Sequence, residues 1–440
     1  MAEGKPKTIV VGGGIGGCTA AIALHHAGAD VTIYESASEL REIGAGINVQ
    51  AVAVGVLSDL GIPVEKFHEP NQGDGILTSG LEYYTTDGIF IASEKVGLAA
   101  GASHPQMSVH RAKFHNTLVA ECRRLLGEER VILNHAFVRL EKTEDEVTVH
   151  FQNNRTKEPY SPVKANFVVG ADGLKSRVRS SLLGDQEPRY TGRTIYRGLC
   201  EVDALSADGN TVSLCGDETG NFICYPISEA MRRQGKFHCN WGFNASRPYP
   251  GGVESWTAMA KIEDIREELA AMDRNTFGGV TPLQMAEKTD KIIGWALFDR
   301  DPLESFDFGN VTLLGDAAHP LLPYGSQGAT QAIMDAEAIG ICYGNAMRND
   351  TGVKGCVKAY SDARCEISGK VVIANRDMGS TAVLRVVNQS CKDMTREEKQ
   401  KWCEENGAKL HEEVIQKYRA AMPKSVRMKK EEEGSYCRIL

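Results

Sequence analysis

The sequence lacks several patterns that mark common classes of protein. Its twelve cysteines are scattered from Cys18 to Cys437 without a single C-x-x-C pair, which argues against a zinc site and against a disulfide framework. No uninterrupted apolar run approaches the roughly twenty residues of a membrane-spanning helix. The net charge is −8, so nothing favours nucleic acid as a partner. We expect a cytoplasmic protein with no metal site, no signal peptide and mostly buried free thiols.

The last four residues are a separate case, because Cys437 to Leu440 match the C-a-a-X pattern of prenylation. A final leucine favours a geranylgeranyl group. However, Arg438 stands at the first aliphatic position and Glu431–Glu433 dilute the basic residues upstream. Such four-residue matches also arise by chance, and we expect no stable membrane insertion. Nothing in the sequence indicates the oligomeric state.

The first thirty-five residues read as strand, glycine turn, helix and strand. Gly12, Gly14 and Gly17 follow the apolar run Thr8–Val11 with the spacing G-x-G-x-x-G. In this motif the first glycine allows the tight turn, the second lets a pyrophosphate approach the backbone, and the third lets the helix lie close to the sheet. Glu35 ends the second predicted strand, where an acid can bind a ribose. The stretch predicts a dinucleotide site.

Two later strands end in the same kind of group. An apolar strand over residues 166–169 breaks at Asp172-Gly173, and another over 310–314 ends in Gly315-Asp316. The ends of parallel strands lie along one edge of a sheet, so the three groups can converge on one extended ligand. A carboxylate beside a glycine can accept hydrogen bonds from a polyol. FAD has a ribityl chain, whereas a nicotinamide dinucleotide has none, and a second glycine fingerprint for NAD(P) is absent.

The predicted fold is α/β, and α+β overall. It combines a Rossmann-like FAD-binding domain, a mainly antiparallel substrate domain and a helical C-terminal tail. We assign residues 1–73, 104–187 and 301–378 to the FAD-binding domain, 74–103 and 188–300 to the substrate domain, and 379–440 to the tail. Helices are expected over residues 49–61, 112–126, 261–273, 281–288, 330–347, 354–377 and 394–420.

These motifs together resemble the class A flavoprotein aromatic hydroxylases. The set comprises Gly12–Gly17 with Glu35, His110-Arg111, Gly170 to Gly173 and Gly315 to Pro320, and the resemblance covers residues 7 to about 378 in order. Within the family, the chain is most similar to the phenazine-carboxylate and salicylate hydroxylase type. The stretches that carry this similarity are residues 41–48, 196–198, 225–228, 240–241 and 299–303.

The resemblance implies a monooxygenase that uses FAD, NADPH or NADH, and O2. In the family, NAD(P)H reduces the flavin without a Rossmann domain of its own. Oxygen then adds at flavin C4a, and the hydroperoxide transfers one oxygen atom to an electron-rich ring. The resemblance implies a small aromatic substrate. The cofactor carries out the difficult step, while the protein positions the ring and excludes water.

The resemblance also implies roles for residues at the FAD site. Glu35 would hold the adenosine ribose, Arg41 and Arg111 the ribose-phosphate region, and Asp316 the ribityl hydroxyls. Asp172 would contribute to both FAD and NAD(P)H binding. Ser326 stands in the loop beside the isoalloxazine where many members have glycine. The full expected cofactor set is Gly12, Gly14, Ile15, Gly16, Gly17, Glu35, Arg41, Gly46, Arg111, Val138, Asp172, Gly315, Asp316, Gly325, Gln327, Gly328 and Ala329.

For the residues on the substrate side, the pattern leaves more than one role open. Tyr225 suits a phenol-binding role or the core, and Arg197 suits a substrate carboxylate or a structural ion pair. Trp241 and Trp295 suit stacking on a flat ring or packing in the sheet. We take as catalytic candidates Arg197, Tyr225 and Pro323, and as substrate-binding candidates Tyr225, Trp241, Trp295 and Tyr324. The sequence does not identify a catalytic base.

Three rival functions share this fold. A flavin halogenase should carry a Trp-x-Trp-x-Ile-Pro stretch, which Asn240–Phe243 does not fit. A flavin-dependent epoxidase or reductase of an isoprenoid-type substrate is the main alternative among enzymes. A non-catalytic flavin-fold binding protein should have lost its flavin contacts, yet Glu35, Arg111, Asp172 and Asp316 are all present.

Overall fold

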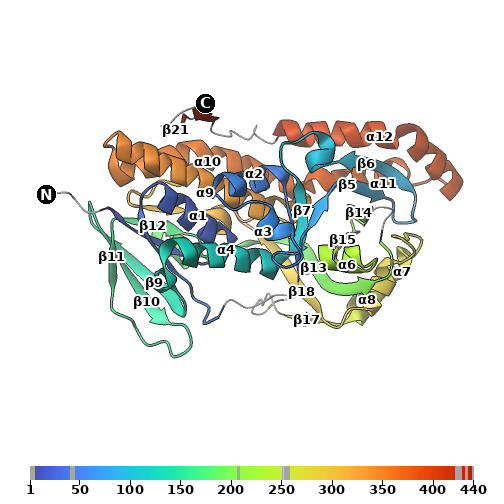
Figure 1. Cartoon of the computed structure of the whole chain (residues 1–440). Coiled ribbons are helices and arrows are strands. Elements are labelled where there is room, and N and C mark those ends of the chain that lie inside the picture. The colour runs from blue at the N-terminus through green and yellow to red at the C-terminus, as the bar shows by residue number, and fades with distance from the viewer. Residues whose placement is uncertain are drawn as a thin grey trace.

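The structure is a computed structural model of the whole chain (Figure 1). Helices are combined with parallel and antiparallel sheets, which confirms the predicted fold class. The residues that the structure describes are 5–39, 45–205, 209–249, 251, 258–421, 429–431 and 435–438.

One sheet is parallel and has the strand order β19-β12-β1-β2-β8. Its strands are β1 (Lys7–Val11), β2 (Asp30–Tyr34), β8 (Val131–Ile132), β12 (Phe167–Gly170) and β19 (Val311–Leu313). Every residue of β12 and β19 is buried, as in parallel sheets that are covered on both faces. The three strands whose ends carry the sequence motifs are β1, β12 and β19. They are direct neighbours, so their carboxyl ends share one edge of the sheet.

Helices α1 (Ile15–His26), α9 (Gln327–Arg348) and α10 (Gly352–Arg376) pack in succession beside this sheet (Figure 1). Residues 17–24 of α1 are all buried, because the sheet and neighbouring helices enclose it. Gly340 of α9 lies against α1 so closely that a Cβ there would be 2.8 Å from the Cβ of Ala23. The close crossing of α1 and α9 therefore requires glycine at this position.

The second large sheet has the strand order β17-β18-β13-β16-β15-β14-β5-β6. All its pairs are antiparallel except β14 with β5, which confirms the antiparallel sheet expected from the aromatic strand-like pieces. The strands are β5 (Gly80–Tyr84), β6 (Phe90–Lys95), β13 (Arg189–Val202), β14 (Thr211–Gly216), β15 (Gly220–Pro226), β16 (Phe237–Ser246), β17 (Met259–Ala260) and β18 (Ile292–Asp299). The assignment of residue ranges to two domains stays a prediction.

Smaller elements complete the region before the C-terminal segment. One three-stranded sheet contains β3 (Gly46–Val49), β7 (Gln106–His110) and β4 (Ile76–Thr78), and another contains β9 (His135–Lys142), β10 (Val147–Asn153) and β11 (Val163–Ala165). The helices are α2 (Ala51–Asp59), α3 (Glu65–His68), α4 (Arg111–Leu126), α5 (Arg177–Leu183), α6 (Glu229–Arg233), α7 (Arg266–Ala271) and α8 (Pro282–Glu287).

The C-terminal segment packs against the eight-stranded sheet. It contains α11 (Ala382–Ser390) and α12 (Arg396–Ala421), followed by β20 (Lys429–Glu431) and β21 (Ser435–Arg438). Helix α12 lies along β6 (Figure 1). The side chain of Cys437 in β21 and the last two residues lie outside the described part of the chain. Among the described helices, none has the length and apolar character needed to cross a membrane.

A buried ionic cluster ties the third strand end to helices α9 and α10. The carboxylate of Asp335 accepts hydrogen bonds from Arg364 Nε at 2.7 Å and His319 Nε2 at 2.6 Å. It also accepts the backbone N–H of Gly315 at 3.0 Å. Burial favours the neutral acid, but His319 and Arg364 outweigh it and hold the pKa of Asp335 well below its ordinary value. The cluster therefore fixes the Gly315-Asp316 turn from the protein side.

Replacing Asp335 by Asn is expected to lower the free energy of unfolding by about 3–5 kcal/mol, because Arg364 would stay buried without its charge partner. Urea unfolding measures this loss. The folded pKa of Asp335 lies below the unfolded value of about 3.9, so its stabilisation is fully present at neutral pH. The difference between wild type and Asp335→Asn should shrink only as the pH falls below about 4, towards the folded pKa.

The matched control is Asp362→Ala, which removes an exposed ion pair with Lys358 on α10 at 2.8 Å. Exposed helix pairs contribute about 0.5 kcal/mol or less. A loss for Asp335→Asn no larger than that of Asp362→Ala would contradict a structural role for the cluster.

Candidate active site

The glycine turn between β1 and α1 is shaped by close backbone contacts. Gly12 has a φ of +105°, and a Cβ there would lie 2.4 Å from the carbonyl oxygen of Ala171. A Cβ at Gly17 would lie 2.0 Å from the carbonyl oxygen of Gly12. By contrast, nothing lies within 4 Å of the position that a Cβ of Gly14 would take. The turn is closed on the protein side and open at Gly14, where a ligand can approach the backbone.

Helix α1 begins at this turn without a hydrogen bond from a capping side chain. The backbone N–H groups of its first turn are therefore available to an anion, and the helix dipole favours negative charge there. Ile15 is buried at the start of the helix, and a Cβ at Gly16 would meet Leu314 at 2.9 Å. His115 of α4 lies beside the turn, with Nε2 2.6 Å from the carbonyl oxygen of Gly13.

Glu35 follows β2 and lies directly beside the glycine turn. Its Oε2 accepts the backbone N–H of Gly13 at 2.7 Å. Its Oε1 accepts the backbone N–H of Ala37 at 2.7 Å and the hydroxyl of Ser36 at 2.9 Å. These bonds fix the carboxylate at the edge of the sheet, next to the open side of the turn.

The second strand end places Asp172 at the start of helix α5. Asp172 accepts the hydroxyl of Ser176 at 2.5 Å and the backbone N–H groups of Arg177 at 2.8 Å and Val178 at 3.1 Å. Burial raises the pKa of Asp172, although these donors act against that shift. The structure therefore gives Asp172 a helix-capping role at the edge where the sequence analysis expects a cofactor contact.

The third strand end places Asp316 opposite Arg111, the first residue of α4. Both side chains have solvent-accessible surface. The protein that surrounds them still removes much of their water, and this burial raises the pKa of Asp316 and lowers that of Arg111. The charges of the two residues act on each other, and His319 also lowers the pKa of Asp316. We infer from the accessible surface and the effect of burial together that the two side chains border a recess, called the hollow below, with one charge of each sign.

These features fit an extended dinucleotide such as FAD. The open space at Gly14 and the uncapped start of α1 suit a pyrophosphate. Glu35 lies beside the turn, where an adenosine ribose would be bound. Arg111 and Asp316 supply a cation for phosphate and an acceptor for hydroxyl groups within the hollow. The turn, Glu35 and Asp316 follow β1, β2 and β19 at one edge of the parallel sheet, and Arg111 lies near Asp316.

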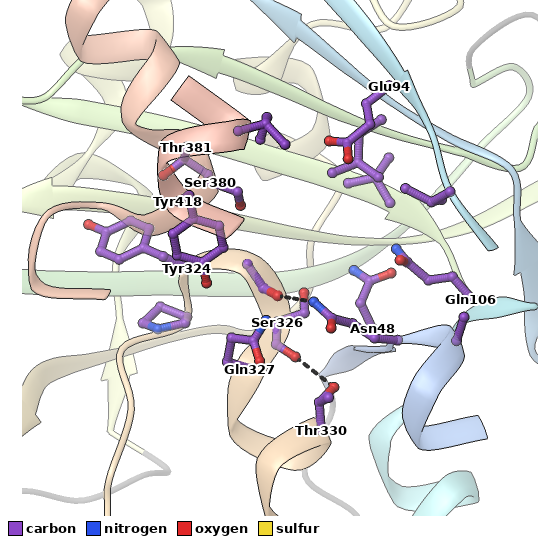
Figure 2. A pocket seen from close by; sticks show the side chains of 18 of the residues that line it. Asn48, Glu94, Gln106, Tyr324, Ser326, Gln327, Thr330, Ser380, Thr381 and Tyr418 are labelled. Atoms are coloured by element: carbon purple, nitrogen blue, oxygen red, sulfur yellow. Dashed lines mark hydrogen bonds between the residues drawn. The ribbon is translucent and has the colours of Figure 1, made fainter. Parts of the chain in front are cut away.

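A cavity of about 590 Å³ lies next to this edge, between the eight-stranded sheet, the α9–α10 region and α12 (Figure 2). Its apolar lining includes Leu214 and Ile223 from the sheet, and its polar lining includes Asn48, Asn244 and Tyr324. Of the predicted site residues, those that line the cavity are Pro323, Tyr324, Gly325 and Gln327. Gly328 and Ala329 follow in the first turn of α9.

The loop that borders the cavity has left-handed backbone at two positions. Gly325 has a φ of +67° and Ser326 a φ of +55°, a region that glycine adopts more easily than serine. Glycine would therefore adopt the backbone of position 326 more easily than the serine present there. Two side chains hold the loop. Gln50 Nε2 donates to the carbonyl oxygen of Gly325 at 2.7 Å, and the hydroxyl of Thr330 donates to the carbonyl oxygen of Ser326 at 3.1 Å.

The structure does not bring Trp241 or Trp295 to the cavity lining. Trp241 is fully buried, stacks on Phe222 and donates from Nε1 to the hydroxyl of Thr289 at 2.8 Å. Trp295 packs beside the cluster that contains Tyr324. The sequence left open whether Trp241 stacks on a flat ring or packs in the sheet. Its contacts support packing in the sheet.

Arg197 and Tyr225 contact strand β3 instead of lining the cavity. Arg197 donates from Nη2 to the carbonyl oxygen of Gly46 at 2.5 Å and lies over the ring of Trp295 at 5.9 Å. Tyr225 is buried, and its ring lies 2.8 Å from the position of a Cβ on Gly46. The backbone N–H of Gly46 donates to Asn240 at 2.6 Å. These residues support the backbone that leads to Asn48, so the structure gives them a positioning role.

The roles of two expected cofactor residues stay predictions. Val138 lies on β9 with 36% of its surface exposed, and Arg41 lies outside the described residues. Conversely, Asn48, Gln50 and Tyr418 line the cavity but were not predicted. Asn48 and Gln50 follow the second glycine-bearing loop, which was a usable signal, whereas no local pattern distinguishes Tyr418.

Comparisons with known proteins agree with this site. The FAD binding domain family model matches residues 5–375. Phenazine 1,6-dicarboxylic acid hydroxylase PhzS of Lysobacter antibioticus is 33% identical over 374 residues, which are 84% of this chain and 89% of that protein. The 3-hydroxybenzoate 6-hydroxylase of Polaromonas naphthalenivorans is 30% identical over 379 residues, which are 84% of this chain and 86% of that protein.

The fold also matches solved structures. That of Klebsiella pneumoniae HpxO, complexed with FAD and uric acid, has a TM-score of 0.71 and 24% sequence identity, and covers 95% of this chain and 97% of that one. The sequence relatives are named as hydroxylases and monooxygenases, which supports hydroxylation over the epoxidase, reductase or non-catalytic alternatives. The chain therefore belongs to the FAD binding domain family and, within it, to the FAD-dependent aromatic hydroxylases, which are monooxygenases that use NAD(P)H and O2.

Proposed function

We propose that this monooxygenase hydroxylates a flat, uncharged aromatic or conjugated small molecule in the cavity beside the Pro323–Gln327 loop. The observation that carries the proposal is the position of this loop. It begins a few residues after the Gly315-Asp316 turn and forms one wall of the cavity. A ligand held along the sheet edge would therefore meet a substrate held in the cavity.

The residues of the shared edge are proposed to hold FAD, with Arg41, Gly46 and Val138 added by the family resemblance. When bound, FAD supplies the redox chemistry, which takes electrons from NAD(P)H and activates O2. The chain's own residues bind and orient the reactants and exclude water. The proposed set in the structure is Gly12, Gly14, Ile15, Gly16, Gly17, Glu35, Arg111, Asp172, Gly315, Asp316, Pro323, Gly325, Gln327, Gly328 and Ala329.

Asn48 is proposed to bind a substrate oxygen. Its Oδ1 accepts the hydroxyl of Ser108 at 2.5 Å, and that hydroxyl also contacts Thr78 at 2.8 Å. These buried contacts fix the amide, so its Nδ2 group is the part that can donate into the cavity (Figure 2). Tyr324 is held in place by Asn244, whose Nδ2 lies 2.5 Å from the phenol oxygen. Burial raises the pKa of Tyr324, so it stays a neutral hydrogen-bonding group.

The distribution of charge around the cavity supports an uncharged substrate. Among the described lining residues, the charged ones are Glu94, Lys95 and Arg419. They belong to β6 and α12, and Arg419 is already paired with Glu94 at 2.7 Å. The remaining lining is apolar, or presents amide and hydroxyl groups that bind neutral carbonyl, amide and phenol groups. The named relatives act on phenazine 1,6-dicarboxylic acid and 3-hydroxybenzoate, which supports an aromatic ring.

Replacing Asp316 by Ala is expected to weaken FAD binding by about 10- to 150-fold, because hydrogen bonds to a charged group contribute about 1.5–3 kcal/mol. Fluorescence titration of the apoprotein with FAD measures the dissociation constant. Asp316→Asn keeps a hydrogen-bond acceptor, so its dissociation constant for FAD should lie between those of wild type and Asp316→Ala. The control Asp362→Ala should bind FAD like wild type. Unchanged FAD affinity in Asp316→Ala would rule out the proposed contact.

Uncharged aromatic compounds are expected to accelerate NAD(P)H oxidation more than their carboxylate counterparts. The screen uses aromatic carboxylic acids paired with their primary amides, together with phenols, phenazines and terpenoid aromatics. Burying a carboxylate among neutral groups is costly, so each amide should stimulate at lower concentration than its acid. Stimulation by the acids alone, or by no compound in the panel, would contradict the proposed substrate class.

A further inference from the structure

We propose that Tyr418 of helix α12 is a positioning residue of the active site, which holds the Pro323–Gln327 loop and closes the cavity beside it. The inference rests on the proposed use of this cavity for substrate. The family model ends at residue 375, before α12 begins at Arg396. The contact is therefore supplied by a part of the chain outside the matched domain.

Helix α12 is fixed along its length to strand β6. A Cβ at Gly407 would lie 2.4 Å from the carbonyl oxygen of Ile91, so the helix and the strand are in direct backbone contact. Further along, the buried ring of His411 lies 4.7 Å from that of Tyr83. Near the end of the helix, Arg419 pairs with Glu94 at 2.7 Å. A helix anchored in this way is a firm wall for the cavity.

The end of α12 brings Ile415, Tyr418 and Arg419 to the cavity. In Figure 2 the ring of Tyr418 extends from its helix towards the loop, near Ser380 and Thr381 of the C-terminal segment. Its hydroxyl oxygen lies 3.1 Å from the position of a Cβ on Gly325. A side chain at position 325 would crowd this hydroxyl, so the loop and α12 are in close contact.

The hydroxyl of Tyr418 also connects to the loop through Asn375. It donates to Asn375 Oδ1 at 3.2 Å, and Asn375 Nδ2 donates to the carbonyl oxygen of Leu322 at 3.2 Å. Asn375 is fully buried, so this relay is shielded from solvent. The Tyr418 hydroxyl also interacts with the side chain of Gln327. Tyr418 therefore acts on both ends of the loop.

The backbone of the loop explains why it needs such support. Ser326 adopts a φ of +55°, a left-handed conformation that is strained for a residue other than glycine. Such a conformation persists only where surrounding contacts impose it. Gln50 holds Gly325 from one side, and Tyr418 with Asn375 holds the loop from the other. Without the Tyr418 hydroxyl, one of these two supports is lost.

The test compares Tyr418→Phe and Tyr418→Ala with wild type, all as FAD-loaded holoenzymes. The matched control is Gln416→Ala, an exposed position on the same helix. Tyr418→Phe should lower kcat/KM about 2- to 10-fold for the best compound of the screen, since it removes one hydrogen bond. The loss should fall on kcat, and the flavin absorption spectrum should shift. Tyr418→Ala should also raise the iodide quenching of flavin fluorescence, because the cavity wall is opened.

FAD content and the unfolding temperature distinguish a positioning role from lost folding, and both should match wild type in Tyr418→Phe. The proposal would be overturned if both Tyr418 variants had the flavin absorption spectrum, the iodide quenching and the kcat/KM of wild type. If only Tyr418→Ala differs, the ring merely fills space, which also overturns it. If wild type binds FAD but no compound stimulates NAD(P)H oxidation, the proposed function fails, while the spectrum and quenching still decide the role of Tyr418.

Discussion

The backbone contact between Gly12 and Ala171 is the constraint on which the site depends. It brings the end of β1 so close to the end of β12 that a side chain at Gly12 would collide with the carbonyl oxygen of Ala171. Because β19 pairs with β12 on the far side, the third strand end is drawn to the same edge. The open position at Gly14 and the carboxyl group of Asp316 thereby lie along the same edge of the sheet, where we propose one continuous ligand site.

The edge carries several carboxyl groups that the structure uses in different ways. Asp335 is buried and paired with Arg364 and His319, so it serves the fold by fixing the Gly315 backbone. Asp172 caps the start of α5, in addition to the FAD contact proposed for it. Asp316 lies opposite Arg111, and none of the described residues donates a hydrogen bond to its carboxylate, which leaves its oxygens for a ligand. Residue type alone does not distinguish these three roles, since the surroundings decide them.

The local features of the fold could be predicted from the sequence. Glycine spacing and apolar strands have local causes, so the turn at Gly12–Gly17, the strand ends at Asp172 and Gly315, and the long helices are found where the pattern places them. Strand β3 and helix α11 were missed, because Gly46–Val49 is short and follows a glycine-bearing loop, and Ala382–Ser390 begins directly after another turn. The parallel pairing of β5 with β14 joins segments far apart in the chain, which periodicity cannot show.

The substrate side of the site was less predictable for the same reason. Alternation along a strand shows that Trp241 and Tyr225 have a definite face, but which face meets the cavity depends on the layers packed above and below. Trp241 is covered by Phe222 and Thr289, and Tyr225 by strand β3. Tyr418 reaches the cavity only because α12 returns to β6 from the far end of the chain. Such contacts are tertiary and leave no local signal.

The central claim is that all three strand ends hold a single FAD molecule. Calorimetric titration of the apoprotein with FAD, and separately with ADP, tests this claim most directly. If only the glycine turn and Glu35 contribute, the two ligands should bind with similar affinity. The account predicts one FAD per chain, bound at least about 100-fold more tightly than ADP, because Asp316 and the Pro323–Gln327 loop contact the ribityl-flavin part, which ADP lacks. Equal affinities for FAD and ADP would contradict it.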